Sequence, residues 1–234
     1  MTLTSGQVAG FTAYAAELVD WNRHTNLTRL ASPGDIAVGH VADSLACLLA
    51  LPADVRDAPG GLTCVDVGSG AGLPGLPLAV LFTAWRVVLL EAGSRKADFL
   101  RHAARTLGLG NVTVLAERAE IAGRSADHRE RYDLAVARAV APLPVLLEYA
   151  LPLLRVGGRL VALVGDVQAR EVRSGSCEHA LELLGGRWSG AHAYRLPGLA
   201  ADRQAVAFTK ARPTPIAYPR RPGVPAKRPL VRRP

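Results

Sequence analysis

The sequence predicts an α/β fold, in which a mainly parallel, doubly wound sheet follows a helical N-terminal region. Two observations in the 234 residues support this fold class. Beyond about residue 61, apolar runs of strand length alternate with segments of helical length, as in sheets covered on both faces. In addition, the glycine-rich stretch VDVGSGAGLPG, at 65–75, directly follows the first apolar run. Since such sheets bind ligands beyond the carboxyl ends of their strands, this stretch is the first candidate site.

The N-terminal region, residues 1–60, is predicted to be helical. Thr4 and Gln7 have the spacing of a capping box, and a helix-spaced apolar face follows it. We expect this face to pack in the core; its members are Val8, Phe11, Ala15, Leu18 and Trp21.

A second helical segment is expected to begin at Ser32–Asp35, where either residue can cap it. Its inner positions are predicted to be Ile36, His40, Leu45, and Leu48 or Leu49. His40 and Asp43 lie one turn apart, so a local hydrogen bond between them is the favoured interpretation, and a role facing a ligand is the alternative.

The alternating part, residues 61–211, begins after the turn-rich stretch DAPGG. Strands are predicted, in chain order, at LTCVDVG, WRVVLLE, NVTVLAE, YDLAVARAV and GGRLVALVG. Helices are predicted between them at PLAVLF, KADFLRHAARTLGL and VLLEYALPLLR. This order places the glycine-rich stretch at the carboxyl end of the first strand.

The net charge of +8 is concentrated in the last 23 residues, which hold seven basic residues, seven prolines and no acid. The rest of the chain is nearly neutral, with 21 basic and 20 acidic residues. So many prolines exclude a regular helix, and we expect an extended or disordered basic tail over 212–234. Such a tail is either a solubilising terminus or a partner for a polyanion, whose counterions it would release.

Several protein classes do not fit the composition. No apolar run approaches the roughly 18 to 20 residues of a membrane span, and the N-terminus has neither a basic leader nor a hydrophobic signal core. The three cysteines, Cys47, Cys64 and Cys177, are far apart and separate from histidines, which indicates neither disulfides nor a metal site. We therefore expect a cytoplasmic protein without a metal.

Three kinds of ligand could explain the glycine-rich loop: a dinucleotide, a phosphate held by a P-loop, and S-adenosylmethionine. Gly70, Gly72 and Gly75 form a dinucleotide-type G-x-G-x-x-G, and Glu91 follows Gly70 by 21 residues, where a ribose-binding acid is expected. A P-loop is excluded because no Gly-Lys-Ser/Thr follows. Asp66 favours the third ligand, S-adenosylmethionine, because an acid in the turn repels a pyrophosphate but suits a cationic methionine moiety. Glu91 would then accept the ribose hydroxyls.

Blocks from Trp21 to Leu230 resemble the bacterial small-subunit ribosomal RNA guanine-N7 methyltransferases, the glucose-inhibited division B family. They are DWNRHTNLTRL, HVADSL, DVGSGAGLPGLPLAV, SRKADFL, YDLAVARAVAPL and YPRRPGVPAKRPL, in one order over nearly the whole chain. The resemblance implies a Rossmann-like methyltransferase fold with a seven-stranded sheet. The last two strands are then expected at RWSGAHAYRL and RQAVAFTKA.

The resemblance also implies methyl transfer from S-adenosylmethionine to N7 of a guanine in 16S ribosomal RNA, by a protein we expect to be a monomer. It implies cofactor contacts at Gly68, Leu73, Ala119, Glu120 and Arg138. Residue type and spacing, independently of the resemblance, predict further cofactor contacts at Asp66, Gly70 and Glu91. The runner-up functions are an NAD-dependent oxidoreductase and a non-catalytic, nucleotide-binding RNA-associated protein.

Arg138 is the candidate catalytic residue. The loop AlaArgAlaVal at 137–140 has neither the Asn/Asp-Pro-Pro-Tyr acceptors used by enzymes that methylate exocyclic amines nor a nucleophilic cysteine. Guanine N7 needs neither, because its in-plane lone pair attacks directly, and catalysis is then alignment with electrostatic control. RNA contacts are predicted for cations at the start of the helix after Glu91 and in the tail, which are Arg95, Lys96, Arg220, Arg221, Lys227 and Arg228.

Overall fold

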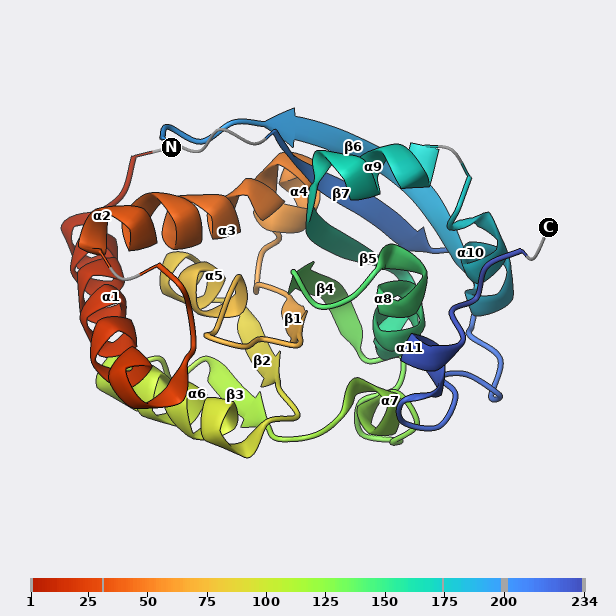
Figure 1. Cartoon of the computed structure of the whole chain (residues 1–234), viewed down its shortest axis with the longest axis horizontal. Helices are drawn as coiled ribbons and strands as arrows, with labels where there is room; N and C mark the ends of the chain where they lie inside the picture. The colour runs from red at the N-terminus through yellow and green to blue at the C-terminus, as the bar shows by residue number, and fades with distance from the viewer. Residues whose placement is uncertain (1, 31, 174, 199–201, 233–234) are drawn as a thin grey trace.

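The computed structural model describes residues 2–30, 32–173, 175–198 and 202–232, and shows a central sheet with helices on both faces (Figure 1). Within these residues the sheet has seven strands in the order β3-β2-β1-β4-β5-β7-β6. The strands are β1 (Thr63–Val67), β2 (Arg86–Leu90), β3 (Val112–Leu115), β4 (Tyr132–Arg138), β5 (Leu154–Gly165), β6 (Gly186–Tyr194) and β7 (Arg203–Lys210). Strands β1 to β5 pair in parallel, and β7 joins β5 and β6 in antiparallel fashion.

Helices precede the sheet and connect its strands. Those of the N-terminal region are α1 (Ser5–Thr25), α2 (Pro33–Ile36), the π-helical η1 (Ala37–Ala42), α3 (Asp43–Leu45), the 3-10 helix η2 (Ala46–Ala50) and α4 (Ala53–Arg56). The others are α5 (Gly75–Leu81), α6 (Ser94–Thr106), α7 (Ala119–Ala122), α8 (Leu143–Ala150), the 3-10 helix η3 (Leu151–Leu153), α9 (Asp166–Arg173), α10 (Glu178–Leu184) and α11 (Val224–Lys227).

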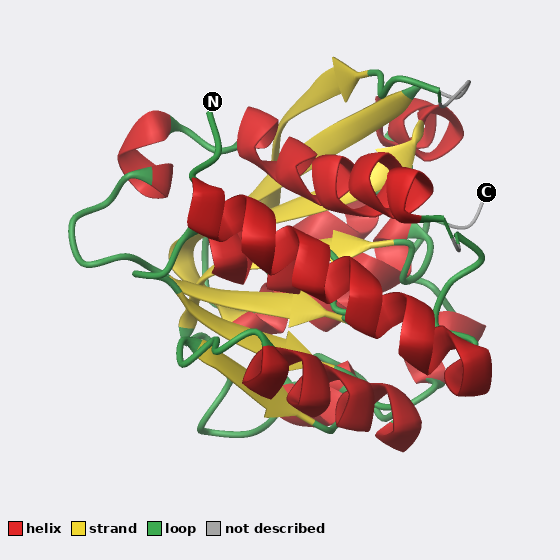
Figure 2. Cartoon of the chain, turned by 90° about the vertical axis from the view of Figure 1, so that its left-hand side faces the viewer, coloured by secondary structure: helices red, strands yellow, loops and turns green. Residues whose placement is uncertain are grey.

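Two buried clusters lie on opposite faces of the sheet, because successive side chains of a strand point to opposite sides. Leu134 and Val136 of β4 belong to the cluster beneath α1, α5 and α6, whereas Ala135 and Ala137 belong to the cluster beneath α8 and α10. Figure 2 shows the helices of the first face as a layer lying across the strands. Strands buried on both faces explain the nearly continuous apolar runs of the sequence.

The predicted sheet is confirmed, including the last two strands, which form β6 and β7. The capping box is confirmed as well, since Thr4 Oγ1 accepts from Gln7 N and Gln7 Oε1 accepts from Thr4 N. The predicted face of α1 is wrong at Val8, which is 49% exposed. Short helices such as α7 and α10 are not predicted from the sequence, because they are held by tertiary contacts rather than by a long apolar period.

The second helical segment begins as predicted, with Ser32 as its N-cap, and continues through four short helices of three types, α, π and 3-10. The π-helical stretch η1 lies in its middle and contains Gly39 and His40, both buried. Of the two alternatives for the last inner position, Leu49 is 49% exposed and Leu48 packs against the core. Because π-helical turns frequently occur at functional sites, the position of His40 in one bears on the site described below.

The C-terminal tail is not the extended free segment that its composition predicts; it folds back beside α7 and α8 (Figure 1). Arg220 forms a bidentate ion pair with Glu148, whose side chain has no exposed surface. Arg124 and Arg129 donate to five backbone carbonyls of the tail, and Leu230 is buried. The prolines therefore exclude long helices but do not prevent a fixed path, because side chains of the domain satisfy the tail's backbone.

Candidate functional site

The glycine-rich loop turns sharply after β1. Gly68, Gly70 and Gly72 all have positive φ, at 70°, 58° and 86°, which residues with a Cβ adopt at a cost. Gly75 opens α5, and a Cβ there would lie 2.4 Å from Leu89 Cδ2 and 2.7 Å from Asp66 Oδ2. The glycines therefore serve backbone geometry and the close packing of α5 on the sheet.

Asp66 lies beneath this loop rather than on the surface of a cavity. Its side chain is fully buried, Oδ2 accepts from Gly75 N at 2.9 Å, and Oδ1 has no partner among the described residues. Burial raises the pKa of this carboxyl to about 7. The structure thus corrects the prediction that Asp66 touches the cofactor: it holds the turn in shape from below, because the strand directs its side chain into the core.

Asp66→Asn should remove a pH dependence of stability. The folded pKa of about 7 exceeds the value of about 3.9 for an unfolded aspartate, so folding favours the protonated form. The stabilisation that this provides is complete below pH 4 and is lost as the pH rises through 7, by up to about 4 kcal/mol. Urea unfolding of the wild type and the variant from pH 4.5 to 8 measures the difference between their free energies of unfolding. The contributions of the other acids are the same in both proteins and cancel. Parallel stability curves would contradict the assignment.

Glu91 follows β2 and connects the loop to the next turn. Its Oε2 accepts from Gly70 N at 2.9 Å and its Oε1 from Gly93 N at 2.7 Å. Each carboxylate oxygen has a second lone pair, so the group can accept two more hydrogen bonds without losing these. That is the pattern that a pair of ribose hydroxyls requires.

Two adjoining cavities open beside Glu91 at the carboxyl edge of the sheet, next to the switch in strand order between β1 and β4. Gly68, Glu91 and Val140 line both of them. The first, of about 360 Å³, is otherwise lined by Leu27, Thr28, His40, Ser69, Gly70, Ala71, Leu73, Lys96, Arg138 and Ala139. The second, of about 140 Å³, is otherwise lined by Val67, Leu90, Ala92, Glu117, Arg118, Ala119, Glu120 and Tyr149.

Seven of the eight residues predicted to contact the cofactor line these cavities, and Asp66 is the exception. Glu120 is 3% exposed, and its Oε1 accepts from Gly223 N of the tail at 2.8 Å. The tail therefore reaches the wall of the second cavity.

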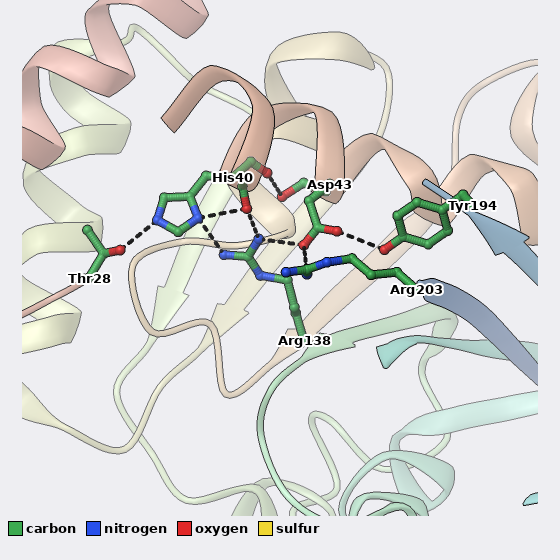
Figure 3. Close-up of polar contacts among 8 residues, drawn as sticks. Thr28, His40, Asp43, Arg138, Tyr194 and Arg203 are labelled. Carbon is green, nitrogen blue, oxygen red and sulfur yellow. Dashed lines mark hydrogen bonds and ion pairs between the residues drawn. The ribbon is translucent and has the colours of Figure 1, made fainter. Parts of the chain in front are cut away.

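Arg138 ends β4, and its guanidinium is held by the N-terminal helical segment (Figure 3). Its Nη1 donates to Gly39 O at 3.0 Å and to Asp43 Oδ2 at 2.8 Å, and its Nη2 donates to His40 Nδ1 at 3.0 Å. Only 13% of the side chain is exposed. Three of its five N–H groups are thus committed, and the other two have no partner among the described residues.

The local hydrogen bond between His40 and Asp43 is a backbone one, from Asp43 N–H to the His40 carbonyl. Their side chains both contact Arg138. Burial, together with the Arg138 charge, lowers the pKa of His40 to about 4. The ring is therefore neutral at pH 7 and lines the first cavity. The alternative that His40 faces a ligand site fits this geometry.

Three residues that the sequence does not single out complete the surroundings. Tyr194 Oη donates to Asp43 Oδ1 at 2.8 Å, and Arg203 Nη1 donates to Asp43 Oδ2 at 2.9 Å. Tyr194 and Arg203 are cross-strand partners on β6 and β7. Tyr14 of α1 donates to Ala71 O of the glycine loop at 2.8 Å. No motif signals these contacts; a tyrosine on an otherwise apolar helical face is the one cue available for Tyr14.

The residues predicted to bind RNA occupy three different situations. Lys96 lines the first cavity, and Arg95 is exposed beside it at the start of α6. Arg221, Lys227 and Arg228 are exposed on the tail, on either side of Gly223 in the sequence, whose N–H donates to Glu120 of α7. Arg220 is committed to Glu148 and to the Arg228 carbonyl, which corrects its assignment to RNA: the buried carboxylate of Glu148 needs this partner.

Elsewhere, a groove of about 760 Å³ between α1 and the following helices is larger, but most of the side chains that line it are apolar. Among the described residues no cluster of three or more histidine, cysteine or acidic side chains could hold a metal ion. No helix in the described ranges is both long and apolar enough to span a membrane. A ligand site is expected where several polar groups converge on a cavity, and this is the case in the two cavities beside Glu91.

Comparisons with known proteins show which family the chain resembles. The GidB family, described as rRNA small subunit methyltransferase G, matches residues 7–184. A ribosomal RNA small subunit methyltransferase G from Roseiflexus castenholzii is 43% identical over 231 residues, 99% of this chain and 95% of that protein. A protein of the same name from Rubrobacter xylanophilus is 48% identical over 220 residues, 93% of this chain and 81% of the relative.

Solved structures show the same fold at low identity. A mutant 16S rRNA (adenine(1408)-N(1))-methyltransferase from Catenulisporales acidiphilia, with its cosubstrate SAM, aligns with a TM-score of 0.53 at 15% identity, covering 74% of this chain and 92% of that one. A SAM-dependent O-methyltransferase from Thermotoga maritima aligns with a TM-score of 0.51 at 17% identity, covering 85% and 72%. These two likenesses concern the fold alone.

Proposed function

The chain belongs to the GidB family, rRNA small subunit methyltransferase G, and we propose that it transfers a methyl group from S-adenosylmethionine to N7 of a guanine in 16S ribosomal RNA. The observation that carries the proposal is the pair of cavities joined at Glu91, with Arg138 fixed at the end of β4. Family membership removes the alternatives of an NAD-dependent oxidoreductase and of a non-catalytic RNA-associated protein.

The residues present fit S-adenosylmethionine. Glu91 has lone pairs for the ribose hydroxyls, and Glu120 with Ala119, which line the smaller cavity, would hold the adenine. Lys96 and Arg138 are the cations available to the methionine carboxylate in the larger cavity. When bound, the cofactor supplies an activated methyl group. Gly68 lines both cavities, where the backbone can approach the ligand closely.

The chain's task is alignment rather than proton transfer. Guanine N7 has an in-plane lone pair and no proton to lose, so no general base is needed. Arg138 is held by Gly39, His40 and Asp43, which fixes the direction of its two remaining N–H groups. A donor on N7 itself would occupy the attacking lone pair, so we assign these groups to the target nucleotide's other acceptors or to a cofactor carboxylate.

Methyl transfer to small ribosomal subunits and to free 16S rRNA, with mass-spectrometric mapping of the product, tests the proposal. We expect one N7-methylguanine per subunit. Arg138→Ala should lower the rate at least 10-fold, the scale expected when one charged hydrogen bond is removed. Arg86→Ala, at the amino end of β2, is the matched control, and its rate of methyl transfer should equal that of the wild type. Methylation at another base, or none by the wild type, would refute the function.

The parts of the chain have different roles in this proposal. Residues 1–60 supply Thr28 and His40 to one wall of the larger cavity, residues 61–211 hold the cofactor, and the tail at 212–234 supplies cations for RNA. We further propose that the protein works as a monomer in the cytoplasm, where ribosomal subunits are assembled. The position of the tail beside Glu120 supports its role, because phosphates flanking the target guanine must pass close to the cavity.

Replacing Arg221, Lys227 and Arg228 together with glutamine should weaken RNA binding and flatten its salt dependence. The slope is expected to change by about 0.7 to 0.9 log units for each phosphate that is no longer neutralised. Filter binding from 50 to 300 mM salt measures it. The matched control removes three exposed charges at the opposite edge of the sheet, Arg86, Arg105 and Arg187. Equal slopes for the two triple variants would show that the tail has no specific electrostatic role.

A further inference from the structure

Thr28 lies in the segment after α1 and lines the larger cavity together with His40 and Arg138 (Figure 3). Its backbone is fixed by Asn22, whose amide Nδ2 donates to Thr28 O at 2.8 Å and whose Oδ1 accepts from Thr28 N at 2.9 Å. The hydroxyl has two further neighbours, His40 Nε2 at 2.7 Å and Leu30 N at 3.0 Å. The direction of each hydrogen bond can be worked out from its partners.

Arg138 determines the tautomer of His40. A guanidinium only donates, so the Nη2 group 3.0 Å away requires His40 Nδ1 to accept. The Gly39 carbonyl, which also lies 3.0 Å from Nδ1, takes a hydrogen from Arg138 Nη1 instead. Since the His40 ring is neutral at pH 7, its one hydrogen must be on Nε2, and Nε2 donates to Thr28.

The Thr28 hydroxyl therefore accepts two hydrogen bonds, from His40 Nε2 and from Leu30 N. A hydroxyl has two lone pairs and one hydrogen, so both lone pairs are in use. No described residue accepts the remaining hydrogen. Thr28 thus presents a donor, with its orientation fixed by three residues, at the wall of a cavity beside the glycine loop.

We propose that the Thr28 hydroxyl determines base specificity by donating a hydrogen bond to O6 of the target guanine. This rests on the proposed function. Guanine carries the O6 acceptor beside N7, whereas adenine carries an amino group there, which is a donor. A fixed donor at this place binds guanine and repels adenine while leaving the N7 lone pair free. Polar discrimination of this kind is strong because the wrong base leaves a buried donor unpaired.

Substituted RNA gives the test. Once the methylated guanine is mapped, it is replaced by inosine, which keeps O6 and N7, or by 2-aminopurine, which keeps N7 but lacks O6. We expect wild-type kcat/KM to change less than about 3-fold with inosine and to fall at least 10-fold with 2-aminopurine. In Thr28→Val, kcat/KM on guanine should fall at least 10-fold, and the discrimination between guanine and 2-aminopurine should be lost.

Thr28→Ser keeps the hydroxyl and is the matched control. Its kcat/KM should stay within about 3-fold of the wild-type value. Affinity for S-adenosylmethionine, measured by calorimetry, should be unchanged in both variants. Undiminished discrimination by Thr28→Val, or an equal loss in both variants, would overturn the proposal. If Thr28→Val does not fold, the analogue series on the wild type decides, since indifference to loss of O6 refutes the assignment.

Two further readouts separate the steps. Nitrogen-15 NMR of the His40 ring should show hydrogen on Nε2 and a bonded, unprotonated Nδ1 at pH 7; the opposite tautomer would overturn the proposal. Failure of the wild type to methylate guanine N7 in unmodified RNA would refute the proposed function instead. That outcome is read without any Thr28 variant, so the two failures are distinguishable.

Discussion

Asp43→Ala is expected to lower the free energy of unfolding by about 3 to 5 kcal/mol, the cost of leaving buried charges without their partner. Asp43 is fully buried and accepts from Arg138, Arg203 and Tyr194. Its removal leaves two partly buried guanidinium groups facing each other. Methyl transfer should fall with stability, because Arg138 is then without the carboxylate that fixes it.

Chemical denaturation of the wild type and the variant measures this decrease in stability. Asp35→Ala is the matched control on the same helical segment, because that carboxylate is exposed and receives its hydrogen bond from Ser32. Tyr194→Phe removes one hydrogen bond while keeping the aspartate, and should cost only about 1 kcal/mol. A decrease below about 1 kcal/mol for Asp43→Ala would mean that the two arginines find other partners.

Gly68→Val is expected to weaken S-adenosylmethionine binding by at least about 100-fold while the protein stays folded. The sequence predicts that a side chain here projects toward the methionine moiety; the structure shows that its Cβ would lie 3.0 Å from both Cγ atoms of Val140. Val140 lines both cavities, so its displacement changes the space that the cofactor needs. A 100-fold weaker affinity corresponds to about 2.7 kcal/mol.

Gly108→Val is the control for backbone strain. Gly108 has a φ of 64°, close to the 70° of Gly68, but a Cβ there has nothing within 4 Å. Both variants should therefore lose similar stability from the left-handed conformation, about 1 to 2 kcal/mol. Only Gly68→Val should lose cofactor affinity, measured by calorimetry. Equal affinity in the two variants would mean that the loop is not the cofactor site.

Local patterns are enough to predict most of the fold and the place of the site. Apolar runs of strand length predict a sheet buried on both faces, and the topological rule places Gly68 and Glu91 at its carboxyl edge. The two residues are close in the sequence, and a single strand–helix–strand unit determines their relative position in space. Glu91 accordingly follows β2 at this edge, and Gly70 N of the loop donates to its carboxylate at 2.9 Å.

The partners of the charged residues cannot be predicted in this way. Asp43 contacts Arg138, Tyr194 and Arg203, which lie 95, 151 and 160 residues further along the chain, and Arg220 contacts Glu148 across 72 residues. A long side chain on a strand end or in a tail reaches several places, and the packing of the elements selects among them. Arg220, predicted as an RNA ligand, forms a structural ion pair for this reason.

The sheet, the glycine-rich turn and the acid opposite it follow from the amino-acid order alone, because strand alternation and backbone geometry depend on neighbours in the chain. Packing between distant elements, in contrast, places Asp66 under the turn and docks the tail on α7 and α8. It also clamps Arg138 against the N-terminal helices. These arrangements depend on desolvation. A buried charge without a partner is costly, so the pairs that form are those whose members the fold brings close together.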